Sequence, residues 1–504
     1  MNKIFKKLSI YLDKAMAFET ASTLFSWDEE TLAPKDASKL TSKVLGILAD
    51  SYFNILINDD VKSLMKKLQE PSVQLTLTYT EKSIVKELEK TYETLEHIPP
   101  NEYRQYHELL AVSGRKWSQA KKDNNYKDFA PVLEQIIDTQ KKFAGYRANA
   151  REETPNLYDV LLNDYEEGFN IAKLDGFFDL IKSEIVPLLK QVTEKQNDIN
   201  KDFNFLSYDI DKQKEFSKFI SEYVGFDFNK GVIAESAHPF TTNLHNHDVR
   251  ITTHYNENNL ESAIFSTIHE AGHAVYEMNI ADELTQTLVG HGASMGIHES
   301  QSRFFENIIG RDIAFWQPIY DKLINTFPEQ LQNIDLEYFI KAINKAEPSL
   351  IRTEADELSY SLHVLIRYEI EKMIFNNEVR VEVLPDLWNE KYEEYMGIKP
   401  SNDTEGVLQD THWALGSFGY FPSYAIGSAI AAQIYYYIKE QIPFDIHLKE
   451  GDLSPIISFL NDNIHKFGKT KTTDQFLFDM MGEEFNAEYY IKYLKEKYNK
   501  LYNL

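Results

Sequence analysis

Most of the chain carries the hydrophobic pattern of amphipathic helices, in which apolar residues recur at three- and four-residue steps. Glycine and proline are sparse, at 20 and 16 of 504 residues, and they fall mostly between the periodic segments. The pattern therefore predicts an all-α protein, mainly helical, with few interruptions inside its helices. The longest predicted helices cover residues 127–149, 170–194, 351–375 and 424–440.

One segment departs from the helical period. At residues 248–255, apolar or β-branched side chains alternate with polar ones, in the order Asp-Val-Arg-Ile-Thr-Thr-His-Tyr. This alternation predicts a β-strand. Together with residues 238–244 it can form a small β-sheet beside the helix that follows. An exposed edge of that sheet can hold an extended peptide by main-chain hydrogen bonds.

A helix is predicted directly after this strand. Its apolar face consists of residues at helical spacing, namely Leu260, Ile264, Ile268, Ala271 and Val275. Asn258 followed by Glu261 resembles a capping box at its start. Gly272 is small, so another segment can approach this helix closely enough to add a side chain to its polar face.

The polar face of the same helix carries an HExxH sequence, formed by His269, Glu270 and His273. Two histidines four residues apart lie one above the other on a helix, which is the geometry that a tetrahedral zinc needs from its first two ligands. Glu270 then lies beside the metal, where its carboxylate can take a proton from water that zinc has activated. This combination hydrolyses amides. The alternative is that two of the 14 histidines share a helix face by chance.

A catalytic zinc site needs a third protein ligand. The extended form HExxHxxGxxH requires glycine and histidine where the chain has Tyr276 and Asn279, which excludes the metzincin arrangement. A glutamate from a following helix is the other possibility, and the predicted helix at residues 296–307 offers Glu299. Its alternative role is a solvated surface pair with Arg303, which contributes about 0.2–0.5 kcal/mol to a helix.

Composition narrows the class of protein further. The formal net charge is −26, and the basic patch that binds nucleic acid or anionic membranes is lacking. The chain has no cysteine, which excludes disulfides and thiol chemistry. The apolar run at the start is broken by Asp13, and no later stretch approaches about 18 uninterrupted apolar residues. We therefore expect a soluble, cytoplasmic enzyme with no nucleic-acid or membrane partner.

Six short motifs follow one another in an order that resembles a known family. In chain order they read HPF at 238–240, DVRIT at 248–252, HEAGH at 269–273, HESQ at 298–301, IRTEAD at 351–356 and GVLQDTHW at 406–413. This set resembles the motifs of the carboxypeptidase Taq family, metal-dependent carboxypeptidases also called thermostable carboxypeptidase 1. Weaker similarity extends upstream through Trp27-Asp28 and Tyr158-Asp159 to Glu166, so the resemblance covers most of the chain.

The resemblance implies one zinc ion per chain, with His269, His273 and Glu299 as ligands and Glu270 as general base and acid. Cobalt is expected to replace zinc, because both metals accept a tetrahedral site of nitrogen and oxygen ligands. The resemblance also implies a mostly helical, saddle-like molecule of the HExxH gluzincin type with a deep groove. The family members are usually homodimers, so a homodimer is expected.

No linker rich in proline, glycine or serine divides the chain. We therefore expect a single domain over residues 1–504. Within it, a helical part at residues 1–225 precedes the part at residues 226–504 that carries the metal and substrate motifs.

A carboxypeptidase must recognise a free C-terminal carboxylate, and arginine has the best shape for bidentate capture of one. Arg352 is the first candidate, and its alternative is a helix-surface pair with Asp356, four residues later. Arg250 is the second candidate. Its alternative is a structural role, tied to Asp248 or to a neighbouring strand.

The charge that develops on the scissile oxygen needs a hydrogen-bond donor besides the metal. The last motif and the glycine-rich stretch after it supply His412, Tyr420 and Tyr424. Related helical HExxH peptidases, of the thimet oligopeptidase and angiotensin-converting enzyme types, use histidine and tyrosine in this way. By this resemblance we expect His412 and Tyr420 to be catalytic and Tyr424 to bind substrate. Packing is the alternative for any one of the 30 tyrosines.

The residues and the resemblance together predict a zinc metallocarboxypeptidase that removes single amino acids from peptides with a free C-terminal carboxylate. An oligopeptidase or dipeptidase of the same architecture would share the metal and the base, but would use the carboxylate anchor differently. The alternative from another class is a metal-stabilised binding protein without activity. Glu270 argues against it, because a structural zinc site is normally closed by four protein ligands and needs no base.

Overall fold

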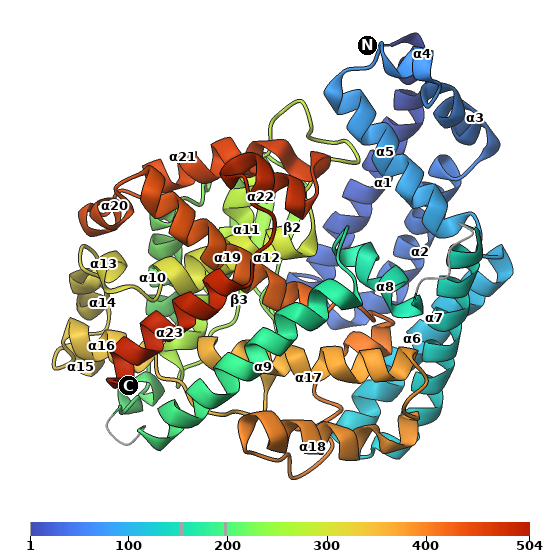
Figure 1. Cartoon of the computed structure of the whole chain (residues 1–504). Coiled ribbons are helices and arrows are strands. Elements are labelled where there is room, and N and C mark those ends of the chain that lie inside the picture. Colours follow the sequence, from blue (N-terminus) through green and yellow to red (C-terminus); the bar gives the residue numbers. More distant parts are fainter. Residues whose placement is uncertain (1, 151–155, 196–198) are drawn as a thin grey trace. The chain divides into compact units, whose positions relative to one another are not determined.

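The computed structural model describes residues 2–150, 156–195 and 199–504. Helices account for 70% of the chain, and one small β-sheet accompanies them, which confirms the predicted fold class (Figure 1). The residues group into two compact units, each made of segments that are distant in sequence. The first unit comprises Met1–Tyr92, Lys201–Ile343 and Ile434–Glu484, and the second comprises Glu93–Asn200, Asn344–Gln433 and Phe485–Leu504. The single domain with a division at residue 225 stays a prediction.

The first unit contains the N-terminal helices and the helix that carries HExxH. Its α-helices are α1 (Lys3–Thr31), α2 (Ser38–Leu56), α3 (Asp59–Leu68), α4 (Pro71–Gln74), most of α5 (Tyr79–Leu95), α10 (Ile210–Tyr223), α11 (Leu260–Met278), α12 (Met295–Arg303), α13 (Ile313–Trp316), α14 (Tyr320–Thr326), α15 (Pro328–Leu331), α16 (Leu336–Ile343), the last part of α19 (Pro422–Gln441), α20 (Phe444–Glu450), α21 (Ser454–Asn463) and α22 (Thr473–Met481). A π-helix, η5 (Phe304–Ile309), directly continues α12. Among the described residues, no single helix has the length and apolar character to cross a membrane, although α2 and α3 together meet those criteria as a pair bent by 46°.

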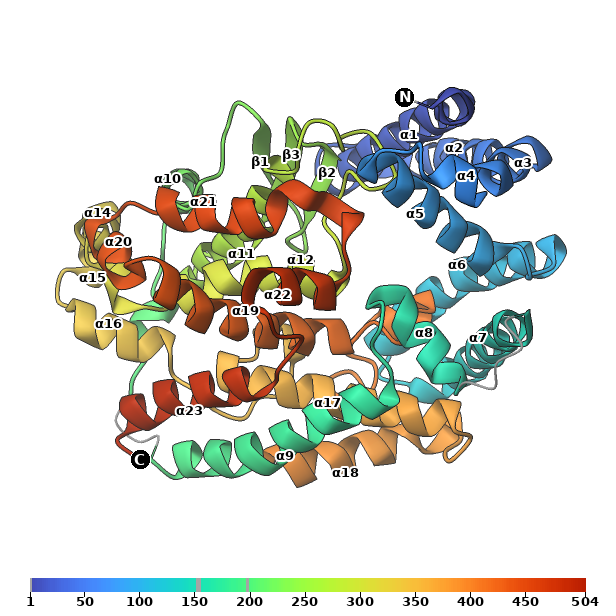
Figure 2. The same cartoon turned by 45° about the horizontal axis from the view of Figure 1, so that its top comes forward.

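A three-stranded sheet with the order β1-β3-β2 lies in the first unit (Figure 2). β1 (Gly231–Glu235) pairs with β3 (Asp248–Thr253) in parallel, and β2 (Thr241–His245) pairs with β3 antiparallel. The two predicted strands are confirmed, although both are shorter than the predicted segments. β1 was not predicted, because its sequence shows no alternation of apolar and polar positions. This agrees with its burial, since only its first residue is buried.

α11 packs against β2, β3, α10 and α12. All five residues of its predicted apolar face are buried. Its N-cap is Asn259, whose side chain accepts a hydrogen bond from Ser262 N at 3.2 Å. The predicted capping box of Asn258 and Glu261 is wrong, because the extended backbone that a cap requires occurs one residue later and Glu261 pairs with Lys201 instead.

The described residues of the second unit form helices joined by loops, without a β-strand. Its α-helices are α6 (Pro100–Lys122), α7 (Ala130–Ala150), α8 (Leu157–Tyr165), α9 (Ile171–Glu194), α17 (Glu357–Phe375), α18 (Leu384–Met396), α23 (Glu488–Tyr502) and the first part of α19 (Pro422–Gln441). Two short 3-10 helices, η6 (Arg352–Glu354) and η8 (His412–Leu415), carry predicted site residues. α9, α17 and α18 lie side by side in both views, and nearly every residue of α17 is buried (Figures 1 and 2).

The predicted helix at residues 351–375 begins later than expected. Asp356 is the N-cap of α17, because its side chain accepts hydrogen bonds from Leu358 N and Ser359 N at 2.9 and 3.0 Å. Arg352 therefore precedes the helix and does not lie on its surface. The other long helices, α7, α9 and α19, start and end within three residues of their predicted positions.

Candidate active site

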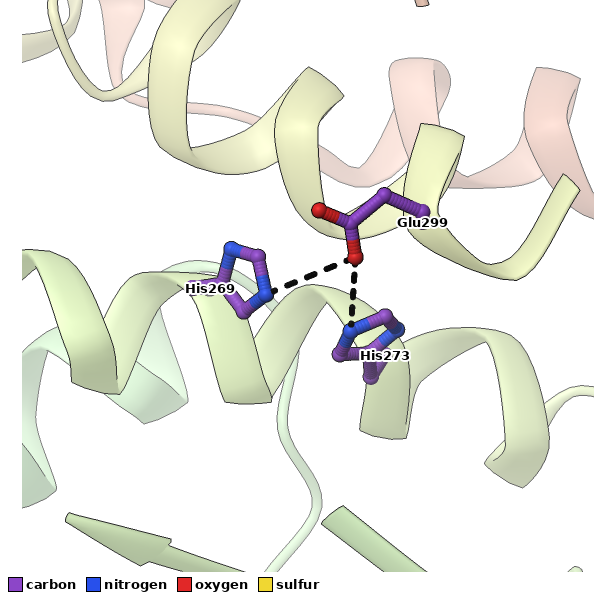
Figure 3. Close-up of side chains that lie close together, drawn as sticks. All are labelled: His269, His273 and Glu299. Atoms are coloured by element: carbon purple, nitrogen blue, oxygen red, sulfur yellow. Dashed lines mark ion pairs between the residues drawn. The ribbon is translucent and has the colours of Figure 1, made fainter. Parts of the chain in front are cut away.

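His269 and His273 on α11 face Glu299 on α12 (Figure 3). The Nε2 atoms of His269 and His273 lie 3.8 and 3.6 Å from Glu299 Oε2. One ligand atom from each of the three side chains lies within 4.8 Å of the others. Bonds of about 2.0–2.2 Å to a tetrahedral zinc place neighbouring ligand atoms about 3.3–3.5 Å apart. The donor types and their spacing therefore fit a divalent metal with little movement.

The close approach of α12 to α11 depends on Gly272. A Cβ atom at this position would lie 2.9 Å from Ser302 Cα and 3.1 Å from Gln301 O. A larger side chain would therefore push α12 away and carry Glu299 out of the cluster. Ile297, on the other face of α12, is fully buried, and this packing turns Glu299 towards the histidines.

The Nδ1 atom of His269 has a carboxylate partner. It lies 2.8 Å from Glu306 Oε2, and Arg303 Nη1 donates to the same oxygen at 3.2 Å. Arg303 Nε also donates to Glu299 Oε1 at 2.7 Å. Glu306 lies in the π-helix η5, a type of insertion that is frequent at functional sites. A neutral His269 donates its Nδ1–H to Glu306 and so directs an unprotonated Nε2 at the cluster.

A second chain of hydrogen bonds orients His273. Its Nδ1 lies 2.5 Å from His298 Nδ1, and His298 Nε2 lies 2.7 Å from Glu277 Oε1. The buried Glu277 carboxylate accepts the Nε2–H of His298, so the Nδ1 of a neutral His298 is an acceptor and takes the proton of His273 Nδ1–H. His273 Nε2 is then unprotonated and available to a metal.

Burial and neighbouring charges set the charge states of these ligands. Burial lowers the pKa of His273 to about 3, so this imidazole is neutral at neutral pH. Burial alone would raise the pKa of Glu299, but Arg303 and His269 outweigh it and hold the pKa well below its ordinary value. Burial also disfavours charge on His269, yet Glu299 and Glu306 outweigh it and raise the pKa of His269. His273 is therefore neutral and Glu299 ionised, which are the charge states in which these side chains bind a metal.

Glu270 lies beside this cluster and is 6% exposed. Thr241, the first residue of strand β2, donates its hydroxyl to Glu270 Oε2 at 2.5 Å. Burial raises the pKa of Glu270 and outweighs the opposing effect of His269. A carboxylate whose pKa is raised is a better base than one in water, and the edge strand holds it in place.

Arg352 lies in the second unit and is almost completely buried. Its Nη2 and Nε donate to Asp410 Oδ1 at 2.9 and 3.2 Å, and its Nη1 donates to Tyr360 Oη at 3.2 Å. Arg367, also buried, donates to Asp410 Oδ2 at 2.6 Å. The alternative pair of Arg352 with Asp356 is wrong, because Asp356 caps α17 and Arg352 precedes that helix.

His412, Tyr420 and Tyr424 lie together in the second unit. His412 Nε2 lies 3.3 Å from Tyr424 Oη, and the His412 and Tyr420 ring centroids are 5.4 Å apart. Burial lowers the pKa of His412 to about 4 against the opposing charge of Asp410. His412 is therefore neutral at neutral pH and can donate one ring N–H.

Arg250 lies on β3 in the first unit. Its Nε and Nη2 donate to the two carboxylate oxygens of Asp248, each at 2.8 Å. Its guanidinium also lies 4.8 Å from the centroid of the Trp27 ring. The structure therefore contains the ion pair with Asp248. This pair is the structural alternative that the sequence left open for Arg250.

A cluster of two histidines and a glutamate on two helices, with a buried glutamate after the first histidine, is the metal site of an HExxH metallopeptidase. The chain belongs to the carboxypeptidase Taq (M32) metallopeptidase family, whose model matches residues 7–498. It is a metallocarboxypeptidase.

Relatives cover nearly the whole chain. Carboxypeptidase 1 of Bacillus subtilis is 44% identical over 98% of this chain and 97% of its own length. Thermostable carboxypeptidase 1 of Pyrococcus furiosus is 34% identical over 99% of each chain. The crystal structure of the M32 carboxypeptidase from Deinococcus radiodurans R1 has a TM-score of 0.95 at 30% identity, and the match covers 100% of both chains.

Sequence reasoning did not assign several residues that surround the metal cluster. Glu277 continues the helical stripe of His269 and His273, and Glu306 lies seven residues after Glu299. Helical spacing could therefore have indicated that both residues lie near the cluster. Thr241 gave no such signal, because strand pairing brings it to Glu270.

We expect Glu306→Gln to weaken metal binding by about 10- to 100-fold, because the hydrogen bond to His269 loses its charged acceptor. Competition with a metal-sensitive chelating dye measures this affinity directly. Glu337→Gln, at an exposed position of α16 in the same unit, is the matched control and is expected to bind metal as the unchanged protein does. Equal affinity in Glu306→Gln and the control would show that Glu306 does not support the site.

Proposed function

We propose that this metallocarboxypeptidase is a zinc enzyme that removes single amino acids from the C-termini of peptides. His269, His273 and Glu299 are its metal ligands, and Glu270 is its general base. The observation that carries this assignment is the three-donor cluster with the buried Glu270 beside it. Three protein ligands leave a position for water, which distinguishes a catalytic site from a structural one.

A divalent metal bound there supplies a Lewis acid that activates water and polarises the scissile carbonyl. Glu270 accepts the proton of the attacking water and then delivers it to the leaving amine. Thr241 holds the Glu270 carboxylate in place for both transfers. Glu306 and the His298–Glu277 pair keep the ligand histidines in the required tautomers.

Arg352 is proposed to bind the substrate carboxylate. Its ion-pair cluster joins two guanidinium groups, those of Arg352 and Arg367, to the single carboxylate of Asp410. Two positive charges against one negative charge favour an additional anion, and a bidentate guanidinium matches a carboxylate. Arg250 is the weaker candidate, because it forms a one-to-one ion pair with Asp248, without the excess of positive charge that Arg352 and Arg367 share.

His412 and Tyr420 are proposed as donors to the oxygen that becomes negatively charged, and Tyr424 as a substrate contact. A low pKa keeps His412 neutral, so it donates a hydrogen bond without needing to carry charge. The hydrogen-bond contact between His412 and Tyr424 supports a shared role for these two side chains. Zinc as the metal and the homodimer are proposals supported by the resemblance to the family. Cobalt as a substitute is proposed from the coordination geometry that it shares with zinc, and the cytoplasmic location from the composition of the chain.

Arg352→Ala is expected to lower kcat/KM on a free-acid peptide by about 30- to 1000-fold, because it removes one partner of a charge-assisted pair in a buried setting. Asp410 keeps Arg367 as partner, so the change leaves no unpaired carboxylate. The unchanged enzyme should shorten this peptide one residue at a time, whether or not its N-terminus is blocked. It should cleave the C-terminally amidated form poorly, and Arg352→Ala should change that rate little.

Mass spectrometry of the products on these three peptides tests both the activity and the anchor. Arg115→Ala, at an exposed position in the second unit, is the control and should leave all rates unchanged. Release of dipeptides or internal fragments would identify a dipeptidase or an oligopeptidase. Equal proportional losses on the acid and the amide would mean that Arg352 is structural and that Arg250 or His412 binds the carboxylate.

A further inference from the structure

A buried carboxyl group in the second unit has three hydrogen-bond donors. Glu371, on α17, is fully buried. Its Oε2 accepts from Tyr158 Oη at 2.7 Å and from Gly419 N at 2.8 Å, and its Oε1 accepts from Trp413 Nε1 at 2.7 Å. These contacts join α8 and α17 to two points on the segment at residues 412–420.

The two points of attachment adjoin the proposed catalytic donors. Trp413 directly follows His412, and Gly419 directly precedes Tyr420. The chain between them turns through Gly416, with φ of 74°, and Gly419 itself has φ of 86°. One carboxylate therefore holds both ends of the loop that presents His412 and Tyr420.

Each oxygen of the Glu371 side chain must act as an acceptor. The Trp413 indole N–H and the Gly419 backbone N–H can only donate, and they meet different oxygens. Protonation at Oε2 would reverse the hydrogen bond with Tyr158, whose hydroxyl can also accept. It would also weaken the hydrogen bond from Gly419 N, because a neutral oxygen is a poorer acceptor than a carboxylate.

We propose that Glu371 is a positioning residue for catalysis, whose carboxylate fixes the loop that carries His412 and Tyr420, and that the loop is held more firmly while this carboxylate is ionised. The inference rests on the proposed roles of His412 and Tyr420. It also gives a role to Tyr158, which anchors the same carboxylate from α8.

Burial raises the pKa of Glu371 to about 7, against the opposing effect of its three hydrogen bonds and of Arg367. The neighbouring titratable groups keep one charge state near this pH. The pKa values of Tyr158 and Tyr165 are raised above the ordinary tyrosine value, chiefly by burial, so both stay protonated. His412 stays neutral because its pKa is lowered to about 4. Of these groups, Glu371 is therefore the one whose charge changes near pH 7.

Glu371→Gln in the metal-loaded enzyme is expected to lower kcat by about 10- to 100-fold while the metal content stays unchanged. The glutamine keeps the size of the side chain, but its amide nitrogen is a donor that would face the N–H of either Trp413 or Gly419. Glu369→Gln is the matched control, because it alters the same helix at a carboxylate that pairs with Lys391 and Tyr395 on α18. It is expected to keep the unchanged kcat.

Fluorine NMR of the enzyme labelled with 5-fluorotryptophan reports on the loop independently of activity. The chain has five tryptophans, and the spectrum of Trp413→Phe assigns the signal of Trp413. In the unchanged protein this signal is expected to shift with pH with a midpoint near 7, and the midpoint is expected to disappear in Glu371→Gln. This midpoint shows that the charge of Glu371 acts on the loop, and the kcat of Glu371→Gln against that of the control shows whether catalysis depends on it.

A Trp413 signal that does not change across this pH range in the unchanged protein would overturn the proposal, and so would a kcat for Glu371→Gln equal to that of the control. The Trp413 titration uses the unchanged protein, so it decides the question even where Glu371→Gln fails to fold. His412→Ala and Tyr420→Phe test the donor roles separately. Unchanged kcat in both would refute the proposed donors, whereas the Trp413 titration would still show whether Glu371 holds the loop.

Discussion

Replacing Glu299 with alanine is expected to remove the metal and abolish peptide hydrolysis. Without Glu299, the proposed site keeps two of its three donors, His269 and His273. Loss of a direct ligand should weaken binding by more than the roughly 10- to 100-fold that follows from loss of a supporting hydrogen bond. His269→Ala and His273→Ala are expected to behave in the same way. Metal content after dialysis and the rate of hydrolysis of a free-acid peptide measure the two effects.

Glu299→Gln separates the loss of a ligand from misfolding, because the amide still offers an oxygen to Arg303. It should still fold when metal is absent, yet bind metal weakly. His97→Ala, at an exposed position, controls for the loss of a histidine. Full activity with full zinc occupancy in Glu299→Ala would remove this residue from the site.

Glu270→Gln is expected to lower turnover by at least about 100-fold while metal and peptide still bind. Glutamine keeps the side-chain shape and can accept the hydrogen bond from Thr241, but it cannot accept a proton from water. Single-turnover kinetics and equilibrium binding of a labelled peptide distinguish the chemical step from binding.

Glu261→Gln is the matched control for this change, because it alters a glutamate on the same helix that pairs with Lys201. It should leave turnover unchanged. A rate for Glu270→Gln within a few fold of the unchanged enzyme would require another base.

Local spacing was enough to predict the elements that depend on local geometry. The four-residue spacing of His269 and His273 places both side chains on one face of any helix, so the sequence predicted this pair and the helix beneath it. The long periodic helices and the strand at residues 248–255 were predicted for the same reason. Errors of a residue or more occurred at ends, as at Asn259, because neighbouring asparagines are equally good caps in sequence and the backbone selects one.

Contacts between distant segments could not be predicted from local spacing. The sequence offered Glu299 as a third ligand and a surface pair with Arg303 as the alternative. The structure contains the pair with Arg303, but buries Glu299 against the histidines. Packing of α12 over Gly272 brings the two helices together, and no local rule predicts that approach.

The sequence by itself determined the helical class and the pairing of His269 with His273 beside Glu270, because each follows from helical periodicity along the chain. Only the tertiary structure decided that Arg352 pairs with Asp410, 58 residues away, and that Glu371 accepts from Tyr158, 213 residues away. Burial requires each polar group to find a partner, but many partners in the chain satisfy that requirement equally well. Which one a side chain meets depends on how all the helices pack together.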